Sequence, residues 1–320
     1  MGASGLVHWD EVETRNVEAG PLSGTWTNLG AAGGSVTTGL RRIVLEASRR
    51  STPVHVHDAE EEIFYILSGA GAGWQDGATY PISAGDCIVH TAGSAAHTLI
   101  AGAAGLDVLA FGTRHASSAC RLPRAGVAWL GPAWVEVNKE PHPWARDLAA
   151  GELVCTEPVA RPGNVVAAAE AEEAADDVGD TRRRRRQLGA AGGSRLTGLN
   201  LVTVGAGGLS CPPHMHSSEE EIFVVLDGEG SLLLYYGDGD AGSPEEHPLR
   251  SGSVVVRPAG TGTAHAIRAG ARPVTLLAYG ERRTEDIAYY PRSRKLSFRG
   301  LGVIGRIEPC GYWDDEPPRA

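Results

Sequence analysis

Two histidines and a glutamate in the first half of the chain have the types and spacing of metal ligands. His55 and His57 lie two residues apart, so on a β-strand both imidazoles would point to the same face. Glu62 follows after a short turn, and a third histidine, His97, precedes a later apolar run. Neutral imidazoles with one carboxylate suit a divalent first-row metal, with one or two positions left for water, substrate or dioxygen. The sequence therefore predicts a metal site formed by these four side chains.

The second half of the chain carries the same four residue types in the same order. Of the 11 histidines, six fall at matching places in the two halves. A chance pair of surface histidines would explain one copy but not a matched set, so we expect metal in at least one half. Three imidazoles and a carboxylate suit most divalent first-row metals, so the candidates are iron, manganese, nickel, copper and zinc. The second set comprises His214, His216, Glu221 and His265.

These ligands belong to an internal duplication. The string Leu-Gly-Ala-Ala-Gly-Gly-Ser at 29–35 recurs letter for letter at 188–194, and 22 of the 41 positions in 29–69 are identical in 188–228. Later matches extend the repeat over nearly the whole chain, with a longer hairpin in the second copy around 236–247. Because a length of 320 residues also suits two domains, we expect one at 1–160 and one at 161–320.

Short strands should position the ligands. The runs 63–67 and 222–226 are rich in β-branched and aromatic residues and stop at Ser-Gly and Asp-Gly turn pairs. Many such runs, separated by turns that use some of the 43 glycines, predict an all-β sandwich or small barrel. The stretch 165–180, rich in alanine and glutamate, is least strand-like and is expected to be a linker or short helix.

The spacing of the ligands resembles the two sequence motifs of the cupin superfamily. The resemblance covers both halves and implies a bicupin, with two tandem antiparallel jelly-roll barrels that each hold a metal through its own quartet. In the second motif three and four residues separate the last glycine from the histidine, where the family usually has two, and Thr91 replaces the usual proline. These departures alter the corner at the pocket mouth. The motifs are His55-x-His57-x4-Glu62-x6-Gly69, His214-x-His216-x4-Glu221-x6-Gly228, Gly85-x5-Thr91-x-Gly93 before His97, and Gly252-x5-Pro258-x-Gly260 before His265.

Three further residues are candidates for catalysis beside the metal. His90 and Arg257 occupy equivalent positions, so that, facing inward, a general base in one copy would correspond to an anion-binding residue in the other. The plainer interpretation places both on the surface at strand ends. Tyr65 is the third candidate, although aromatic residues on barrel strands more often belong to the core. Strand alternation sends Glu61 and Glu220 away from the ligands, where a solvated charge is expected.

Five consecutive arginines, residues 182–186, form the most basic segment of the chain. Acidic residues outnumber them between 170 and 186, so an internally neutralised, solvated segment is favoured over a nucleic-acid site. The repeat aligns Arg185 with Trp26. The run can therefore lead into a strand whose alternate arginines share one face and help to hold a carboxylate-bearing ligand.

Composition narrows the function classes. The chain has 29 basic and 39 acidic residues, a net charge of −10, which argues against general binding of nucleic acid or anionic membranes. Five scattered cysteines without a CxxC pair argue against a disulfide framework. With no signal-like start and no long apolar stretch, a cytoplasmic protein is expected. The aromatic segments 289–292 and 312–313 are expected to pack on a barrel or on a second protomer of a homodimer.

The leading functional hypothesis is a metal-dependent oxidoreductase of a small organic molecule, above all a dioxygenase. It rests on analogy with bicupins such as quercetin dioxygenase and oxalate decarboxylase, because a fold does not fix a function. One alternative is a metal-dependent isomerase or epimerase of a sugar-like substrate, with His90 or a tyrosine moving protons. Another is a non-catalytic bicupin that binds a small molecule. The sequence leaves open which copy is active.

Overall fold

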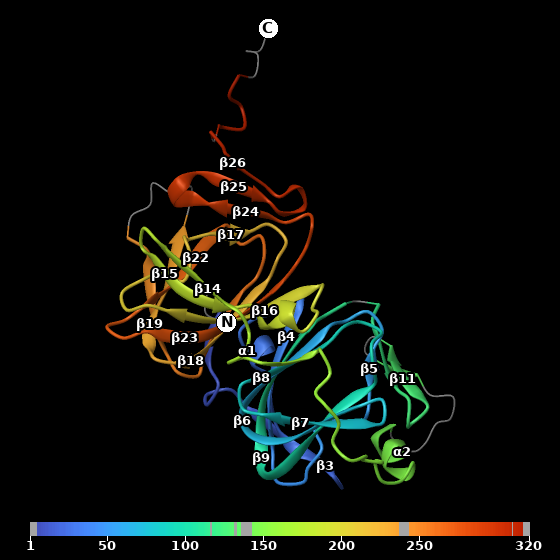
Figure 1. Cartoon of the computed structure of the whole chain (residues 1–320). Coiled ribbons are helices and arrows are strands. Elements are labelled where there is room, and N and C mark those ends of the chain that lie inside the picture. Colours follow the sequence, from blue (N-terminus) through green and yellow to red (C-terminus); the bar gives the residue numbers. More distant parts are fainter. Residues whose placement is uncertain are drawn as a thin grey trace.

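Two β-barrels in contact with each other make up the chain (Figure 1). The computed structural model describes residues 5–115, 117–130, 133–135, 143–236, 243–308 and 310–315. Within these ranges, every ladder between named strands is antiparallel. The all-β fold with two tandem jelly-roll barrels, expected from the repeat, is confirmed. No helix in the described ranges is long and apolar enough to cross a membrane.

The first barrel is built on a sheet in the order β13-β8-β6-β9-β4-β3-β2, with β7 paired to β6. The β6–β7 hairpin turns at Asp76 and Gly77, whose positive φ angles of 47° and 93° are those a two-residue Asp-Gly turn requires. A smaller sheet, β12-β11-β10-β5, covers one end. The strands are β2 (Thr14–Ala19), β3 (Leu22–Thr27), β4 (Thr38–Leu45), β5 (Val56–His57), β6 (Glu62–Gln75), β7 (Ala78–Ser83), β8 (Asp86–His90), β9 (His97–Thr113), β10 (Ala119–Leu122), β11 (Val127–Leu130), β12 (Ala133–Val135) and β13 (Val165–Ala167).

The second barrel repeats this plan with the order β1-β21-β18-β23-β16-β15-β14, a sheet β20-β19-β22 and an end sheet β17-β24-β25-β26. The expected longer hairpin is β19–β20, and its tip at 237–242 lies outside the described residues. The strands are β1 (Leu6–His8), β14 (Glu173–Val178), β15 (Thr181–Arg186), β16 (Thr197–Val204), β17 (Met215–His216), β18 (Glu221–Asp227), β19 (Glu229–Tyr236), β20 (Glu245–Arg250), β21 (Ser253–Arg257), β22 (Thr263–Ala269), β23 (Val274–Glu281), β24 (Ile287–Tyr290), β25 (Lys295–Phe298) and β26 (Val303–Arg306). The helices are α1 (Leu29–Ala32), α2 (Pro143–Ala149), α3 (Leu188–Ala191), η1 (Pro291–Ser293) and η2 (Arg299–Leu301).

Each barrel includes one short strand from the other half of the sequence. Strand β1, at the start of the chain, pairs with β21 of the second barrel, and β13, from the connecting segment, pairs with β8 of the first. We propose that a division near residue 160 separates the two repeats. The exchange means that cutting the chain there would leave each barrel with an unpaired strand edge.

The connecting segment 165–180 forms strands β13 and β14, so the expectation of a linker or short helix there is wrong. Strand β14 lies beside the arginine-rich β15, and Glu173, Asp176 and Asp177 face Arg186, Arg183 and Arg182 across the ladder. Pairs of opposite charge on neighbouring strands stabilise a sheet. These cross-strand pairs therefore override the helical preference of the alanines in this stretch.

A shared apolar core joins the two barrels. Along β6, Phe64 and Ile66 point into the first barrel, whereas Ile63 and Tyr65 point to the contact with the second. Residues Ile222 and Val224 of β18 meet them from the other side. Each barrel keeps its own inner core, and the layer between them is as deeply buried as either.

Two glutamates link the barrels reciprocally. Glu61 accepts hydrogen bonds from Ser194 Oγ (2.5 Å) and from Thr197 Oγ1 (2.5 Å) and N (3.2 Å) in the second copy. Glu220 accepts the equivalent bonds from Ser35 Oγ (2.7 Å) and from Thr38 Oγ1 (2.5 Å) and N (3.0 Å) in the first. The exposed fractions of the two glutamates are 0% and 1%, so the expectation of solvated charges is wrong. The repeated string ending in Ser35 and Ser194 is thus part of this contact.

Candidate metal centres

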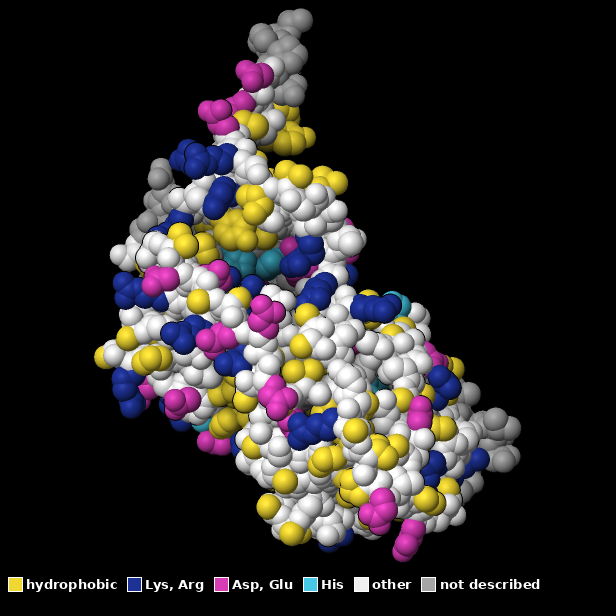
Figure 2. Space-filling model, in the orientation of Figure 1, with side chains coloured by type: hydrophobic (Ala, Val, Ile, Leu, Met, Phe, Trp, Pro, Cys, Tyr) yellow, Lys and Arg dark blue, Asp and Glu magenta, His cyan; other side chains and the backbone are white. Residues whose placement is uncertain are grey.

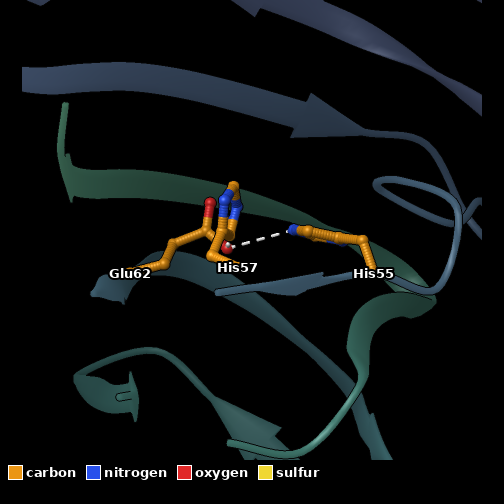
Figure 3. A group of neighbouring side chains, drawn as sticks. All are labelled: His55, His57 and Glu62. Carbon is orange, nitrogen blue, oxygen red and sulfur yellow. Dashed lines mark hydrogen bonds and ion pairs between the residues drawn. The ribbon is translucent and has the colours of Figure 1, made fainter. Parts of the chain in front are cut away.

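In the first barrel the four predicted ligands converge on one carboxylate oxygen. His55 directly precedes β5, His57 ends it, Glu62 begins β6 and His97 begins β9. The Nε2 atoms of His97, His55 and His57 lie 3.0, 3.3 and 3.9 Å from Oε2 of Glu62. Figure 3 shows the two rings of the His-x-His pair directed toward this carboxylate. The strand alternation that predicted a shared face for His55 and His57 is therefore observed.

The second barrel repeats this geometry. The Nε2 atoms of His265, His214 and His216 lie 3.0, 3.6 and 3.6 Å from Oε2 of Glu221. Nε2 of His216, Nε2 of His265 and Oε2 of Glu221 are buried, and although they approach to 3.0–3.6 Å, none is aligned for a hydrogen bond with any described residue. Buried polar atoms are nearly always satisfied, and one divalent cation would satisfy these three together. The residues present fit such a metal.

Backbone carbonyls orient the imidazoles. Nδ1 lies 3.0 Å from a carbonyl oxygen in His55 (Pro53), in His97 (Ala95) and in His214 (Pro212). A donating Nδ1–H fixes the tautomer whose Nε2 lone pair is free for a metal. His216 uses a carboxylate instead, because its Nδ1 lies 2.7 Å from Oδ2 of Asp286. The matching Nδ1 of His57 lies 3.2 Å from Oε2 of Glu60.

Burial and the mutual approach of these groups shift their pKa values. Burial raises the pKa of Glu62 and Glu221, but the surrounding histidines outweigh it and hold both pKa values well below the ordinary range. Burial lowers the pKa of His265 to about 4. Burial and the nearby His97 also lower the pKa of His55. Charged neighbours instead outweigh burial and raise the pKa of His57, His214 and His216. Because metal binding needs neutral imidazoles, a metal would displace protons from these three rings.

His90 and Arg257 face inward, and the plainer interpretation that placed them on the surface is wrong. Strand β8 pairs His90 with Glu62, and β21 pairs Arg257 with Glu221, which puts each on the same sheet face as a ligand. Their exposed fractions are 3% and 5%. The ring of His90 stacks on His97 with centroids 3.5 Å apart. Neither lines the cavities described below, and a catalytic role for either stays a prediction.

Tyr65 lies on the opposite face of β6 from the ligand Glu62. It packs with Cys87 and Ile63 in the core between the barrels, and burial raises the pKa of its hydroxyl. The prediction that Tyr65 takes part in catalysis is therefore wrong, because odd-numbered residues of this strand point away from the metal site.

The cavity of the first barrel is mainly apolar. It has a volume of about 340 Å³ and reaches His55, His57 and Glu62. Trp26 and Trp144 meet in it with ring centroids 6.1 Å apart at 49°. The apolar and aromatic side chains that line it include Trp26, Phe64, Phe111, Leu122, Trp129 and Trp144.

The cavity of the second barrel is larger and more polar, with a volume of about 780 Å³ that reaches His214, His216 and Glu221. Figure 2 shows histidine side chains at the bottom of a hollow in the upper lobe, with basic and hydrophobic side chains at its rim. Charged and polar residues from several strands and loops line it. They include Arg183, Arg185, Asn200, Glu219, Arg282 and Asp286.

Two residues of the second site were not predicted. The ring of Tyr290 stacks on His214 with centroids 5.6 Å apart at 21°, and Asp286 binds His216. Both come from the arm around β24, which packs on its own barrel through β17, one of the two outcomes expected for the aromatic segment 289–292. Tyr312 and Trp313 contact each other and are exposed. The signal for Tyr290 was its place in a Tyr-Pro-Arg string echoed at 122–124 as Leu-Pro-Arg.

Comparison with known proteins agrees with this geometry. A model of the cupin domain matches residues 41–108 and 200–279, which contain the two ligand quartets. The chain therefore contains two cupin domains, one in each barrel. No curated protein is significantly similar in sequence to this bicupin.

Solved structures with a similar fold include bicupin oxalate decarboxylases. A deletion mutant of the Bacillus subtilis enzyme has a TM-score of 0.57 at 16% identity, covering 86% of this chain and 76% of that chain. A formate complex of the Lactobacillus farciminis enzyme has a TM-score of 0.57 at 13% identity, covering 88% and 87%. A third structure, from a study of the Mn(II) centres of the Bacillus subtilis enzyme, has a TM-score of 0.57 at 13% identity, covering 88% and 78%. At these identities the similarity establishes the fold.

Proposed function

We propose that the bicupin is a metal-dependent oxidoreductase of the dioxygenase type, acting in its first barrel on a small organic molecule. The substrate has an aromatic or otherwise apolar body and one oxygen donor. The supporting observation is the lining of the first cavity, where metal ligands meet a wall of aromatic side chains. Such a wall accommodates a planar apolar body, while three imidazoles and a carboxylate leave positions for its oxygen atom and for dioxygen.

Some residues of the first barrel would hold the metal, and others would orient the substrate. His55, His57, Glu62 and His97 would hold a divalent metal. When bound, a redox-active metal such as iron or manganese supplies the electron exchange between substrate and dioxygen. A substrate ring beside Trp26 and Trp144 gains about 0.5–1.5 kcal/mol from ring contacts beyond area burial.

A cation at the rim would complement a charged substituent. The guanidinium of Arg41 lies 6.0 Å from the ring centroid of Trp26, and Arg41 lines the same cavity. A phenolate or carboxylate on the substrate would therefore meet a positive charge as it enters. This favours phenols, enols and aromatic acids over neutral hydrocarbons.

The alternatives are less well supported. An isomerase or epimerase that uses His90 or Tyr65 to move protons is not supported, because neither side chain lines the first cavity. A binding module without turnover is compatible with the same lining. Oxygen consumption separates it from an oxidoreductase.

The test is oxygen uptake by full-length protein loaded with iron or manganese, measured against a panel of phenols, diketones and aromatic acids. We expect uptake coupled to substrate loss, abolished in His57→Ala and retained in Glu46→Ala, which changes an exposed glutamate that does not line the cavity. Turnover of a panel member under anaerobic conditions would overturn the proposal. So would tight binding of a panel member with no turnover under either metal.

A further inference from the structure

Strand β15 presents alternate arginines to the second cavity. Arg183 and Arg185 line it, whereas Arg182 and Arg184 point outward, with 60% and 70% of their side chains exposed. The alternation follows from the two-residue period of a strand. Two of the five arginines therefore belong to a cavity wall, and two others belong to the solvated surface.

The two inward arginines differ in their partners. Arg183 donates from Nε to Oδ2 of Asp176 (2.7 Å) and from Nη1 to the carbonyl oxygen of Ser210 (3.0 Å). The Nε of Arg185 is buried and, among the described residues, has no hydrogen-bond partner. Burial and the adjacent Arg183 lower the pKa of Arg185, and only Asp176, already bound to Arg183, raises it. The Arg185 guanidinium is thus partly desolvated without an acid of its own.

Four acids line the same cavity, and each is engaged elsewhere. Glu221 faces the three ligand histidines, and Glu281 accepts from Thr37 Oγ1 and from the Arg283 guanidinium. Glu219 accepts from the backbone N–H of Arg283 (2.7 Å) and from the Arg299 guanidinium. Asp286 binds His216 and the backbone N–H of Ser218. These carboxylates therefore do not neutralise Arg185.

The first barrel has no such charge at the matching places. Cross-strand pairing places Arg185 opposite Val202 and Trp26 opposite Ile43, so the two residues are structural equivalents as well as sequence equivalents. By the same alignment, Gly24 stands where the second barrel has Arg183. One copy thus has an aromatic ring where the other has a guanidinium.

We propose that the second cavity binds a small organic carboxylate through Arg185, as a site distinct from the apolar site of the first barrel. The planar guanidinium can donate two parallel hydrogen bonds to a carboxylate, and a desolvated guanidinium gains more from them than an exposed one. The Tyr290 ring on His214 adds an apolar face for the carbon part of the ligand. The inference concerns the second barrel and does not depend on oxygen chemistry in the first.

The test is calorimetric titration of metal-loaded full-length protein with succinate, benzoate and inorganic phosphate. We expect at least one carboxylate to bind, at least about tenfold more weakly in Arg185→Gln, with partial recovery in Arg185→Lys. Arg184→Gln is the matched control, since Arg184 is on the same strand but points outward, and loss of its exposed pair with Glu173 should leave the affinity within about twofold.

A further variant guards against misfolding. Arg185→Trp installs the residue that the first barrel carries at this position, so the fold should accept it while carboxylate binding is lost. The proposal is overturned if neither carboxylate binds, if Arg185→Gln binds as tightly as the parent protein, or if Arg184→Gln weakens binding equally. Binding of phosphate as tight as that of the carboxylates would also overturn it, because the site would then be a general anion site.

Discussion

The two barrels share their metal ligands and differ in the walls around them. Three imidazoles and one glutamate meet in each barrel, and each barrel buries one glutamate in the other. Where the first barrel has Trp26, Leu122 and Trp129 around the ligands, the second has Arg185, Tyr290 and Ser297. The residues that would hold the metal and those that join the barrels are matched. The residues that would contact an organic ligand are not. We infer that the two copies keep the same metal-binding residues but accept two different kinds of organic ligand.

Substituting a metal ligand should have the largest effect, because it disrupts the metal site of one barrel and leaves that of the other intact. His57→Ala should empty the first site and His216→Ala the second, each lowering metal affinity at its own barrel by at least about 100-fold. Elemental analysis of each variant would report the loss of one metal per chain. If neither substitution removed metal, or if each removed both, the assignment of two independent quartets would be wrong.

Removing a reciprocal glutamate should destabilise the whole molecule. Glu61→Ala removes the buried acceptor of the Thr197 hydroxyl and of the backbone N–H groups of Thr197 and Arg195, whereas Ser194 Oγ can still donate to the carbonyl oxygen of Thr197. We expect the free energy of unfolding to fall by about 3 kcal/mol, and Glu220→Ala to match it. Urea denaturation followed by fluorescence measures both, with the exposed Glu46→Ala as the control. A large difference between the two variants would show that the contact is not symmetric in energy.

The sequence predicts which residues surround each metal site better than it predicts the contacts between the barrels. Local alternation and the repeat were enough to place His55, His57 and Glu62 on one face, because both depend only on neighbours in the chain. Alternation also sent Glu61 away from the ligands. It did not reveal that the second barrel lies there, since a buried acceptor and a solvated charge leave the same local pattern.

Long-range pairing accounts for the remaining differences. Strand β14 forms because its acids face the arginines of β15, and its composition alone favours a helix. The exchange of β1 and β13 depends on which sheet edges are free once both barrels have formed. Tyr290 reaches His214 only because its arm folds back over the barrel. None of these contacts has a signature within a short window of sequence.

The residues behind the ligands give a smaller, site-specific prediction. Asp286 accepts from Nδ1 of His216, while the position that the repeat aligns with it in the first barrel is Ser118. Asp286→Asn should lower metal affinity in the second barrel by roughly 10- to 100-fold and leave the first barrel unaffected. Competition titration with a chelator, carried out in the His57→Ala background, isolates the second site. Equal metal affinity of the second site with and without Asp286→Asn, both in the His57→Ala background, would show that Asp286 does not support the ligand.

The smallest expected effect is a difference in the pH at which the barrels release metal. Burial and His97 lower the pKa of His55. Burial also lowers that of His214, but Cys211 and Glu221 outweigh it, and the pKa of His214 lies well above its ordinary value. A proton competes with the metal once the pH falls below the pKa of the free ligand. As the pH falls, the second barrel should therefore lose its metal first, at a higher pH than the first.

The residue beside Nδ1 of His214 offers a way to test the cause of this difference in release pH. Cys211 Sγ lies 3.5 Å from Nδ1 of His214, and Thr52 Oγ1 lies 3.3 Å from Nδ1 of His55 at the matching position. Cys211→Thr should therefore lower the pKa of His214 and move metal release from the second barrel toward the pH of the first. Metal content after dialysis across a pH series, in the His57→Ala background, measures the shift. If release stays at the pH of the parent site, the thiol is not what separates the two barrels.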